Sequence, residues 1–172
     1  MTSAGIIDLT PFAKLLVEGP DAEAFLNYIT ANKIPKVGRT VITHILTSTG
    51  HVYAELTVTR TKEDSFLVIT GSGVEMHDLR WLQEQARHGG WKVSLANQTD
   101  DLGCLSVAGP KSKQILSKLS LAFEGKFPFF SAKEVRCVCV CVCVCVCVCV
   151  CVFKYSSDGS SSFSPATLHL LL

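Results

Sequence analysis

The chain has 172 residues and an almost balanced charge, with 16 Lys and Arg against 15 Asp and Glu and a formal net charge of +1. This balance leaves no strong basic field for phosphates, so we expect neither a nucleic-acid partner nor a membrane-surface role. The length suits one ordinary domain. Residues 137–152, an uninterrupted Cys-Val alternation, raise the hydrophobic share to 48% and hold eight of the nine cysteines. Without this run the sequence is typical of a Cys-poor globular protein from a reducing compartment.

The first twelve residues, MTSAGIIDLTPF, have no basic segment followed by a long apolar stretch, and they are not rich in Arg. We therefore expect neither a secretory signal nor a transit peptide there. No apolar run of 18 residues precedes the Cys-Val alternation, so no membrane span is expected in the body of the chain.

Two segments of the body match each other, LLVEGPDAEAFLNYIT at residues 15–30 and LSVAGPKSKQILSKLS at residues 105–120. Each predicts a short strand, a glycine, a proline at the first helical position and an amphipathic helix. The helical spacing rests on Ala24, Phe25, Tyr28, Ile29, Ile115, Leu116 and Leu119. The pair indicates two pseudo-symmetric strand–helix units.

The stretch between these segments is rich in β-branched residues. It predicts strands at residues 40–46, 52–59 and 66–70, joined by polar turns. A helix is expected at residues 74–90, with Met76, Leu79 and Leu82 on its apolar face and Gly89-Gly90 at its end. Another strand is expected at residues 91–95. Strands with helices inserted between them favour an α+β domain with a mostly antiparallel sheet.

The Cys-Val run allows three interpretations. As a strand, it would put every Cys on one face and every Val on the other. As a metal site it would need a backbone that folds back on itself, which stiff β-branched Val at every second position opposes. The third interpretation, which we favour, is a translated TG dinucleotide repeat, because TGT encodes Cys and GTG encodes Val. The Ser-rich residues that follow, up to the apolar end at residue 172, are expected to be disordered.

Residues 6–38, 44–58 and 66–86 together resemble the folate-binding domain shared by the aminomethyltransferase (T-protein) of the glycine cleavage system and its relatives. The phrases ANKIPKVG, VYAELTV, ITGSG and HDLRW look most like the dimethylglycine dehydrogenase branch of that family, with the sarcosine dehydrogenases next. The resemblance runs from about residue 5 to about residue 135. It implies the N-terminal portion of the aminomethyltransferase folate-binding fold at residues 1–135, truncated, with residues 136–172 as a non-homologous tail.

The resemblance also implies a role. Enzymes of this branch oxidise an N-methyl amine with FAD in one region. Their folate domain then captures the oxidised methyl group on tetrahydrofolate as 5,10-methylenetetrahydrofolate. The sequence shows no flavin-binding glycine fingerprint. We therefore expect a fragment with half of a tetrahydrofolate site, separated from the FAD domain of its parent and inactive alone. Mitochondrial matrix is the implied compartment.

The resemblance places Glu55 where relatives carry a catalytic Asp. A carboxylate there can orient folate, accept a proton or stabilise a cationic iminium. A solvent-exposed strand residue is the plainer interpretation, since strands alternate their faces.

Weaker candidates for folate contact are Leu46 and Thr47, in a loop that lines the pterin site of relatives, and Tyr53, which could stack on an aromatic ligand. Core packing of Leu46 and turn formation by Thr47 would explain these two equally well, and core packing is the favoured interpretation of Tyr53. Gly71 stands where relatives often carry Asn, so we expect one pterin interaction of the relatives to be missing or moved in this chain.

Other residues in the body have plainer explanations. His77 beside Asp78 suggests a solvated or capping pair. Cys104 is expected to be a packed thiol on a buried strand. No two histidines have metal-pair spacing, so no metal site is expected. Two further functions stay open, a non-catalytic folate-binding module or aminomethyltransferase, and a metal-thiolate protein built on the tail.

Overall fold

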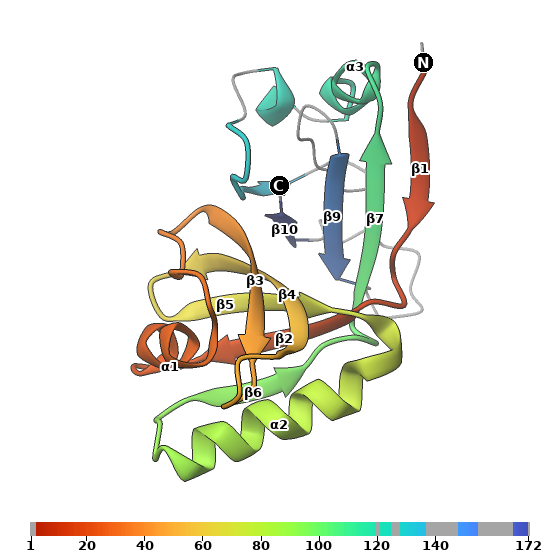
Figure 1. The fold of residues 1–172 in the computed structure, drawn as a ribbon. Coiled ribbons are helices and arrows are strands. Elements are labelled where there is room, and N and C mark those ends of the chain that lie inside the picture. The colour runs from red at the N-terminus through yellow and green to blue at the C-terminus, as the bar shows by residue number, and fades with distance from the viewer. Residues whose placement is uncertain (1–2, 120, 125–127, 137–147, 155–166, 172) are drawn as a thin grey trace. The chain divides into compact units, whose positions relative to one another are not determined.

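The computed structural model describes residues 3–119, 121–124, 128–136, 148–154 and 167–171 (Figure 1). It divides into unit 1, comprising Met1–Pro11 and Asp100–Leu172, and unit 2, comprising Phe12–Thr99. The elements of unit 2 are β2 (Ala13–Glu18), α1 (Ala22–Ile29), β3 (Arg39–Leu46), β4 (Val52–Lys62), β5 (Ser65–Thr70), the 3₁₀ turn η1 (Ser72–Val74), α2 (Glu75–His88) and β6 (Ser94–Asn97). Those of unit 1 are β1 (Gly5–Asp8), β7 (Leu102–Ala108), α3 (Ser112–Ser117), the 3₁₀ turn η2 (Leu121–Phe123), β8 (Glu134–Arg136), β9 (Val148–Lys154) and β10 (Thr167–Leu171).

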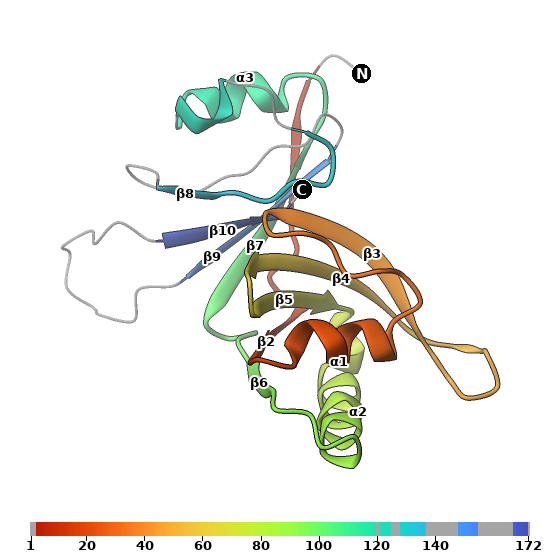
Figure 2. The same cartoon turned by 90° about the vertical axis from the view of Figure 1, so that its left-hand side faces the viewer.

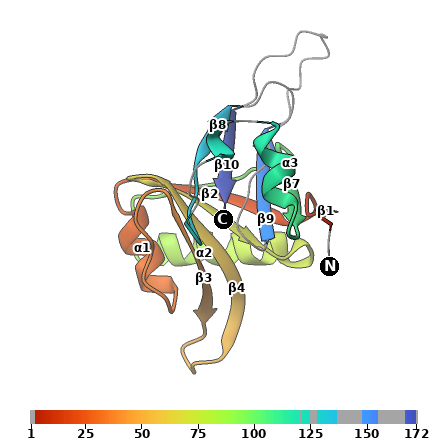
Figure 3. The same ribbon diagram turned by 90° about the horizontal axis from the view of Figure 1, so that it is seen from above.

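Unit 2 is a five-stranded antiparallel sheet in the order β3-β4-β5-β2-β6. The predicted meander of three strands is confirmed, with short polar turns between the strands. The β3–β4 hairpin extends beyond the rest of this sheet, as Figures 2 and 3 show from two directions. The predicted strand at residues 91–95 begins later, at Ser94.

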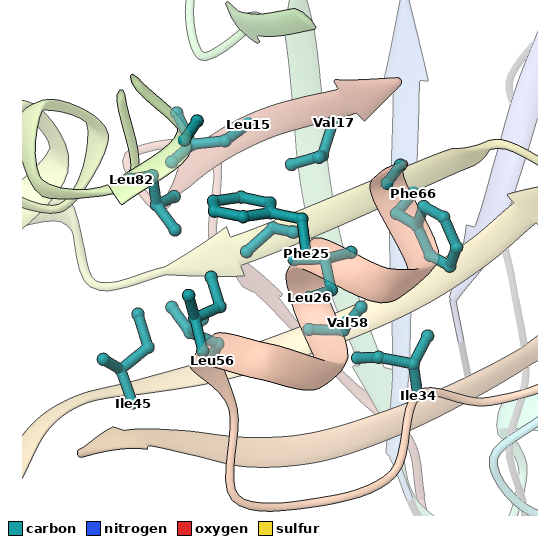
Figure 4. Packing of buried hydrophobic residues seen from close by; sticks show 14 of the residues in the cluster. Leu15, Val17, Phe25, Leu26, Ile34, Ile45, Leu56, Val58, Phe66 and Leu82 are labelled. Carbon is teal, nitrogen blue, oxygen red and sulfur yellow. The ribbon is translucent and has the colours of Figure 1, made fainter. Parts of the chain in front are cut away.

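The core of unit 2 lies on one face of this sheet, where α1 and α2 both pack. Figure 4 shows Phe25 and Leu26 of α1 among side chains of the strands, with Leu82 of α2 beside Phe25. The cluster comprises Leu15, Val17, Ala22, Phe25, Leu26, Ile29, Ile34, Ile45, Leu56, Val58, Phe66, Val68, Leu79, Leu82 and Ala86. Burying a side chain of this kind contributes roughly 1.5–3 kcal/mol, so this face stabilises the unit.

Alternation along the strands decides which residues face these helices. Leu56 and Val58 of β4 point into the cluster, so the residues between them point to the opposite face of the sheet. The predicted apolar helix faces are confirmed only in part. In α1, Phe25 and Ile29 are buried but Ala24 and Tyr28 are exposed, and in α3, Leu116 is buried but Ile115 is exposed. In α2, Leu79 and Leu82 are buried as expected. Met76 is exposed, because the buried stripe runs through Asp78, Leu79, Leu82 and Ala86 instead.

A β-bulge interrupts the hairpin close to its tip. Ile45 pairs with Ala54 and Leu46 pairs with Val52, which leaves Tyr53 as the extra residue on β4. A bulge rotates the following side chains relative to the partner strand. Tyr53 and Ala54 consequently both pack against the helix-side cluster, although they are neighbours in sequence.

The sheet of unit 1 has the order β1-β7-β9-β10-β8 and is also antiparallel. β1 pairs with β7 and was not expected from the sequence. Residues 148–152 of the Cys-Val run belong to β9, while residues 137–147 lie outside the described part of the chain. The disorder expected at the end is corrected for residues 167–171, which form β10; residues 155–166 lie outside the described ranges.

The two predicted strand–helix copies are confirmed as β2–α1 and β7–α3. The prolines do not occupy the first helical position, however. Pro20 and Pro110 follow glycines in a tight turn, in which Ala22 N–H donates to the Gly19 carbonyl and Ser112 N–H donates to the Gly109 carbonyl, each at 3.0 Å. Proline is favoured at the second position of a type I turn because its φ is already fixed near −65°. The last residue of each turn, Ala22 or Ser112, is therefore the first residue of the helix.

Cys104 lies fully buried on β7, as expected. Among the described residues, no helix is both long enough and apolar enough to cross a membrane.

Candidate functional site

A cavity of about 560 Å³ opens on the helix-covered side of unit 2. It lies between the C-terminal end of α1, the tip of the β3–β4 hairpin and the middle of α2. We call it the helix-side pocket, and its lining residues are Tyr28, Ile29, Thr30, Ala31, Leu46, Thr47, Ser48, Tyr53, Trp81 and Gln85.

The first wall forms because α1 ends abruptly at Thr30. Thr30 has extended backbone angles (φ −113°, ψ 149°), and its hydroxyl donates to the Leu26 carbonyl at 2.8 Å. The next residue, Ala31, donates its N–H to the His44 carbonyl at 2.9 Å. These bonds replace the helical pattern and fix the end of α1 against β3.

The hairpin turn forms the second wall. Gly50 has φ +81°, a left-handed conformation that suits glycine, and its N–H donates to the Thr47 carbonyl at 2.9 Å. The Thr47 hydroxyl accepts the His51 N–H at 3.1 Å and lies 2.9 Å from the Thr49 hydroxyl. Thr47 therefore shapes the turn as well as lining the helix-side pocket.

Tyr53 links the pocket to a chain of polar groups on β5 and α2. Its hydroxyl lies 2.9 Å from His77 Nε2, and His77 Nδ1 lies 3.0 Å from Asp78 Oδ1. The Thr70 hydroxyl donates to Asp78 Oδ2 at 2.6 Å. A neutral His77 whose Nδ1–H faces Asp78 has a bare Nε2, which can accept the Tyr53 O–H. The order is therefore Tyr53, His77, Asp78, Thr70.

The environment of Asp78 differs from the solvated pair that the sequence led us to expect at His77 and Asp78. The side chain of Asp78 is only 1% exposed, although that of His77 is 57% exposed. A buried carboxylate needs hydrogen-bond donors, and Thr70 and His77 supply one to each oxygen. Burial and the nearby carboxylates of Asp78 and Glu84 raise the pKa of the Tyr53 hydroxyl above its ordinary value. Tyr53 therefore stays protonated and neutral around pH 7.

Stacking also fixes the ring of Tyr53. Its centroid lies 4.8 Å from that of His77 and 5.1 Å from that of Trp81, with interplanar angles of 14° and 30°. Contacts of this kind are worth about 0.5–1.5 kcal/mol beyond the buried area. Tyr53 is thus held from its ring as well as from its hydroxyl.

Glu55 does not line the helix-side pocket. It follows Ala54 and precedes Leu56, both of which pack on the helix side, so Glu55 points to the opposite face of the sheet. There its carboxylate lies 3.2 Å from Nε2 of His44, its partner across the strands. Both side chains are largely exposed, so the pair is worth at most about 1 kcal/mol and leaves the carboxylate accessible.

Gly71 lies at the end of β5, before η1, and does not line the helix-side pocket. Its backbone angles (φ −63°, ψ 144°) are ordinary for any residue. A Cβ there would meet only Val74 Cγ2, at 3.5 Å. A larger side chain at this position is therefore sterically permitted.

Of the five candidate residues, the structure brings Leu46, Thr47 and Tyr53 together and leaves Glu55 and Gly71 elsewhere. Four pocket residues contributed by the helices were not expected there, namely Tyr28, Ile29, Trp81 and Gln85. The phrase HDLRW contains His77, Asp78 and Trp81, and Trp81 lies four residues after His77 and three after Asp78, which are the spacings of helical neighbours. Within the described ranges, no group of three or more His, Cys, Asp or Glu could hold a metal ion.

Residues 1–149 match a family model described as the GCVT N-terminal domain. The mitochondrial dimethylglycine dehydrogenase of Rattus norvegicus is 52% identical over 120 residues, covering 70% of this chain and 14% of that protein. The enzyme of Homo sapiens is 50% identical with the same coverage. An aminomethyltransferase of Desulfitobacterium hafniense is 31% identical over 121 residues, covering 69% of this chain and 33% of that protein. The chain thus spans a small part of the relatives it matches.

Two solved structures share the fold. The glycine cleavage system aminomethyltransferase T from Bartonella henselae matches 99% of this chain and 42% of its own, with a TM-score of 0.71 and 19% identity. A heterotetrameric sarcosine oxidase from Corynebacterium sp. U-96 matches 98% of this chain and 75% of its own, with a TM-score of 0.59 and 14% identity. The first match confirms the expected α+β fold, an N-terminal portion of the aminomethyltransferase architecture.

Proposed function

Because the chain belongs to the GCVT N-terminal domain family, we propose that it forms the first part of a tetrahydrofolate-binding, one-carbon-transfer domain. The parent would be a flavoenzyme of the dimethylglycine dehydrogenase type. The observation that carries this proposal is the identity of 50–52% to mammalian dimethylglycine dehydrogenases over 120 residues. The names of those relatives also support a mitochondrial location, for which we propose the matrix.

The role of this chain would be to hold folate next to an oxidised N-methyl group. Tetrahydrofolate supplies the nucleophilic nitrogens that take up the one-carbon unit. FAD would belong to another part of the parent, which oxidises the amine. Since this chain corresponds to 14% of the length of such relatives, we propose that it provides half of the folate site and is inactive alone.

Glu55 is our candidate for the acidic group of this site. Its carboxylate is accessible and sits beside His44, so it has no deep partner that would have to be broken when a ligand arrives. A negative charge there would favour a cationic iminium close to the folate nitrogens, and it could accept the proton that a nitrogen releases. This chemistry fits an exposed carboxylate on a rigid strand.

The test is Glu55→Ala in a full-length parent that carries the same residues. We expect the yield of 5,10-methylenetetrahydrofolate to fall about 10²-fold or more, the usual range for general acid–base groups, while amine oxidation by the flavin continues. Glu55→Asp is the matched control and should keep most of the transfer. Equal loss of oxidation and transfer in Glu55→Ala would contradict the proposed role.

The other candidate residues allow a second test of the same proposal. Leu46, Thr47 and Tyr53 remain predictions as folate-binding residues, and a missing pterin interaction at Gly71 remains a prediction as well. Because space for a side chain exists at Gly71, Gly71→Asn should fold normally and tighten tetrahydrofolate binding in the parent. Unchanged binding by a folded variant would remove Gly71 from the site.

We also propose that residues 136–172 are a tail unrelated to the domain, with the Cys-Val run as a translated repeat, although the family match reaches residue 149. The order of the strands in unit 1 supports this proposal. In the sheet, β9 and β10 take the places that β5 and β4 have in unit 2, but they occur in the opposite order along the chain. Sequencing the transcript across Arg136 tests it, because a message that continues without the repeat is expected. An abundant message containing the repeat would contradict it, and bound zinc or cadmium after purification would favour the metal-thiolate alternative.

A further inference from the structure

His44 lies directly opposite Glu55 on the face of the unit 2 sheet that points away from α1 and α2. The two residues are partners across β3 and β4, and His44 Nε2 lies 3.2 Å from Glu55 Oε2. Their neighbours in the two strands, Thr43 and Leu56, are buried. Side chains that face each other on adjacent antiparallel strands are close enough to interact directly. The register of the hairpin therefore brings His44 to the Glu55 carboxylate.

The backbone of His44 is held from both sides, although β3 is the edge strand of its sheet. The β4 strand pairs with one side. On the other side, the His44 carbonyl accepts the Ala31 N–H at 2.9 Å, and Asn32 Nδ2 donates to the Ile42 carbonyl at 2.8 Å. These bonds occupy backbone groups that an edge strand would otherwise leave open. The imidazole of His44 thus projects from a fixed backbone.

The direction of the hydrogen bond between the two side chains is defined. An ionised carboxylate only accepts, so the proton must lie on His44 Nε2. That proton is present in the charged imidazole and in one of the two neutral tautomers, so the bond does not require a charged ring. Because the pair engages Oε2 of Glu55, Oε1 is the oxygen that can face a ligand.

Glu55 is a side chain that benefits from such a partner. Its side chain is 70% exposed, so packing does little to fix it, while that of His44 is 42% exposed. Ordering a flexible side chain such as Glu costs conformational entropy. A reacting group is most effective when its orientation is set before the ligand arrives. A donor that holds one carboxylate oxygen supplies part of that orientation.

We propose that His44 is a positioning residue for Glu55, holding Oε2 so that Oε1 is directed at the cationic iminium or at the proton that a folate nitrogen releases. His44 itself makes no contact with the ligand. This inference rests on the role proposed for Glu55 in one-carbon transfer. Since both side chains are exposed, losing the pair should slow transfer about two- to fivefold, the range for an exposed ion pair.

The test measures amine oxidation and formation of 5,10-methylenetetrahydrofolate in a full-length parent that carries the same residues. His44→Leu keeps an apolar side chain of similar size but removes the donor, so transfer should fall about two- to fivefold while oxidation continues. His44→Gln should recover most of the loss, because its amide N–H can replace Nε2–H. Ile42→Val, on the same strand and face, is the matched control and should change neither rate.

A double variant shows whether His44 acts through Glu55. In the Glu55→Ala background, His44→Leu should cause no further loss of transfer, because the carboxylate that it positions is gone. Thermal unfolding of each variant checks the fold. If Glu55→Ala lowers transfer but His44→Leu does not, if His44→Gln restores nothing, or if the two losses add, the positioning role is overturned while the role of Glu55 stands. Unchanged transfer in Glu55→Ala would instead overturn the proposed function and this inference with it.

Discussion

Units 1 and 2 are built around the same three-strand junction, although their sequences differ. In unit 2, Val17 of β2 lies between Leu95 of β6 and Phe66 of β5. In unit 1, Val107 of β7 lies between Ile6 of β1 and Cys149 of β9. Counted from the glycine after the central strand, Gly19 or Gly109, the residues that pair with the two neighbouring strands correspond position by position in the two units. The two units therefore share one register.

The end of the outer strand makes two corresponding hydrogen bonds in each unit, although the Thr99 hydroxyl donates to Asn97 Oδ1 and the Thr10 hydroxyl to the Cys104 carbonyl. Asn97 Oδ1 accepts the Thr99 N–H, and the Thr99 hydroxyl accepts the N–H of Lys14 at 3.1 Å. Asp8 Oδ1 accepts the Thr10 N–H, and the Thr10 hydroxyl accepts the N–H of Cys104, also at 3.1 Å. A short Asx-x-Thr motif thus closes each junction, because both side chains satisfy backbone donors where a strand stops.

The units differ in the strands that complete their sheets. The orders β3-β4-β5-β2-β6 and β8-β10-β9-β7-β1 correspond position by position. However, β10 follows β9 along the chain, whereas β4, which has the place of β10, precedes β5. β9 lies where β5 lies in unit 2, and its sequence comes from the Cys-Val run and the residues after it. Alternating β-branched residues pair readily with an open strand. This difference indicates that residues close to the junction determine its register, while the strand that pairs with β7 needs only a high β propensity.

The largest expected difference between the units concerns their helices. Phe25 of α1 and Ile115 of α3 occupy the same place, six residues after the glycine, but Phe25 is fully buried and Ile115 is 43% exposed. Phe25→Ala should therefore destabilise the protein by about 3–5 kcal/mol, and Ile115→Ala by less than about 1 kcal/mol. Urea unfolding measures both. Equal losses would mean that the two helices dock by the same face.

The two glycines should behave alike. Gly19 and Gly109 have φ values of +134° and +118°, and a Cβ at either would overlap a backbone oxygen, of Lys92 or of Ser3. Each Gly→Ala change should cost about 3 kcal/mol through strain and displaced backbone. Gly50→Ala is the control, with φ +81° but open space, and should cost about 1 kcal/mol. A tolerated change at only one of the pair would break the correspondence.

Smaller effects than those of Gly19→Ala and Gly109→Ala are expected at Thr99 and Thr10, the threonines that close the two junctions. Thr99→Val and Thr10→Val each remove a hydroxyl that accepts a backbone N–H, so each should cost about 1–2 kcal/mol. Thermal unfolding of the two variants measures the losses, and Thr99→Ser, which keeps the hydroxyl, should recover most of the first. A cost confined to Thr99→Val would show that unit 1 does not depend on its junction.

Local patterns predicted most of unit 2. The β-branched runs and the Gly-Gly helix end act within a few residues, so a single sequence shows them. The repeated Gly-Pro step predicted both strand–helix units but not the turn that leads into each helix. β1 was missed because four residues carry little periodicity and their partner on β7 lies about a hundred residues later.

The site was less predictable than the fold for the same reason. The bulge that turns Tyr53 toward the helices has no glycine or proline to announce it, so strict alternation would have put Tyr53 on the face of Glu55. Asp78 looked solvated beside His77, but Thr70 on another strand supplies the donor that allows its burial. Contacts between elements, which a single sequence does not display, decided both residues.

The most direct test of the account is isothermal titration of tetrahydrofolate into this chain and into a full-length parent. If the chain holds half of a folate site, its Kd should be weaker than about 100 μM, or binding should be undetectable, while the parent binds at least tenfold more tightly. Micromolar binding by the chain alone, equal to that of the parent, would contradict the claim that it is half of a one-carbon-transfer site.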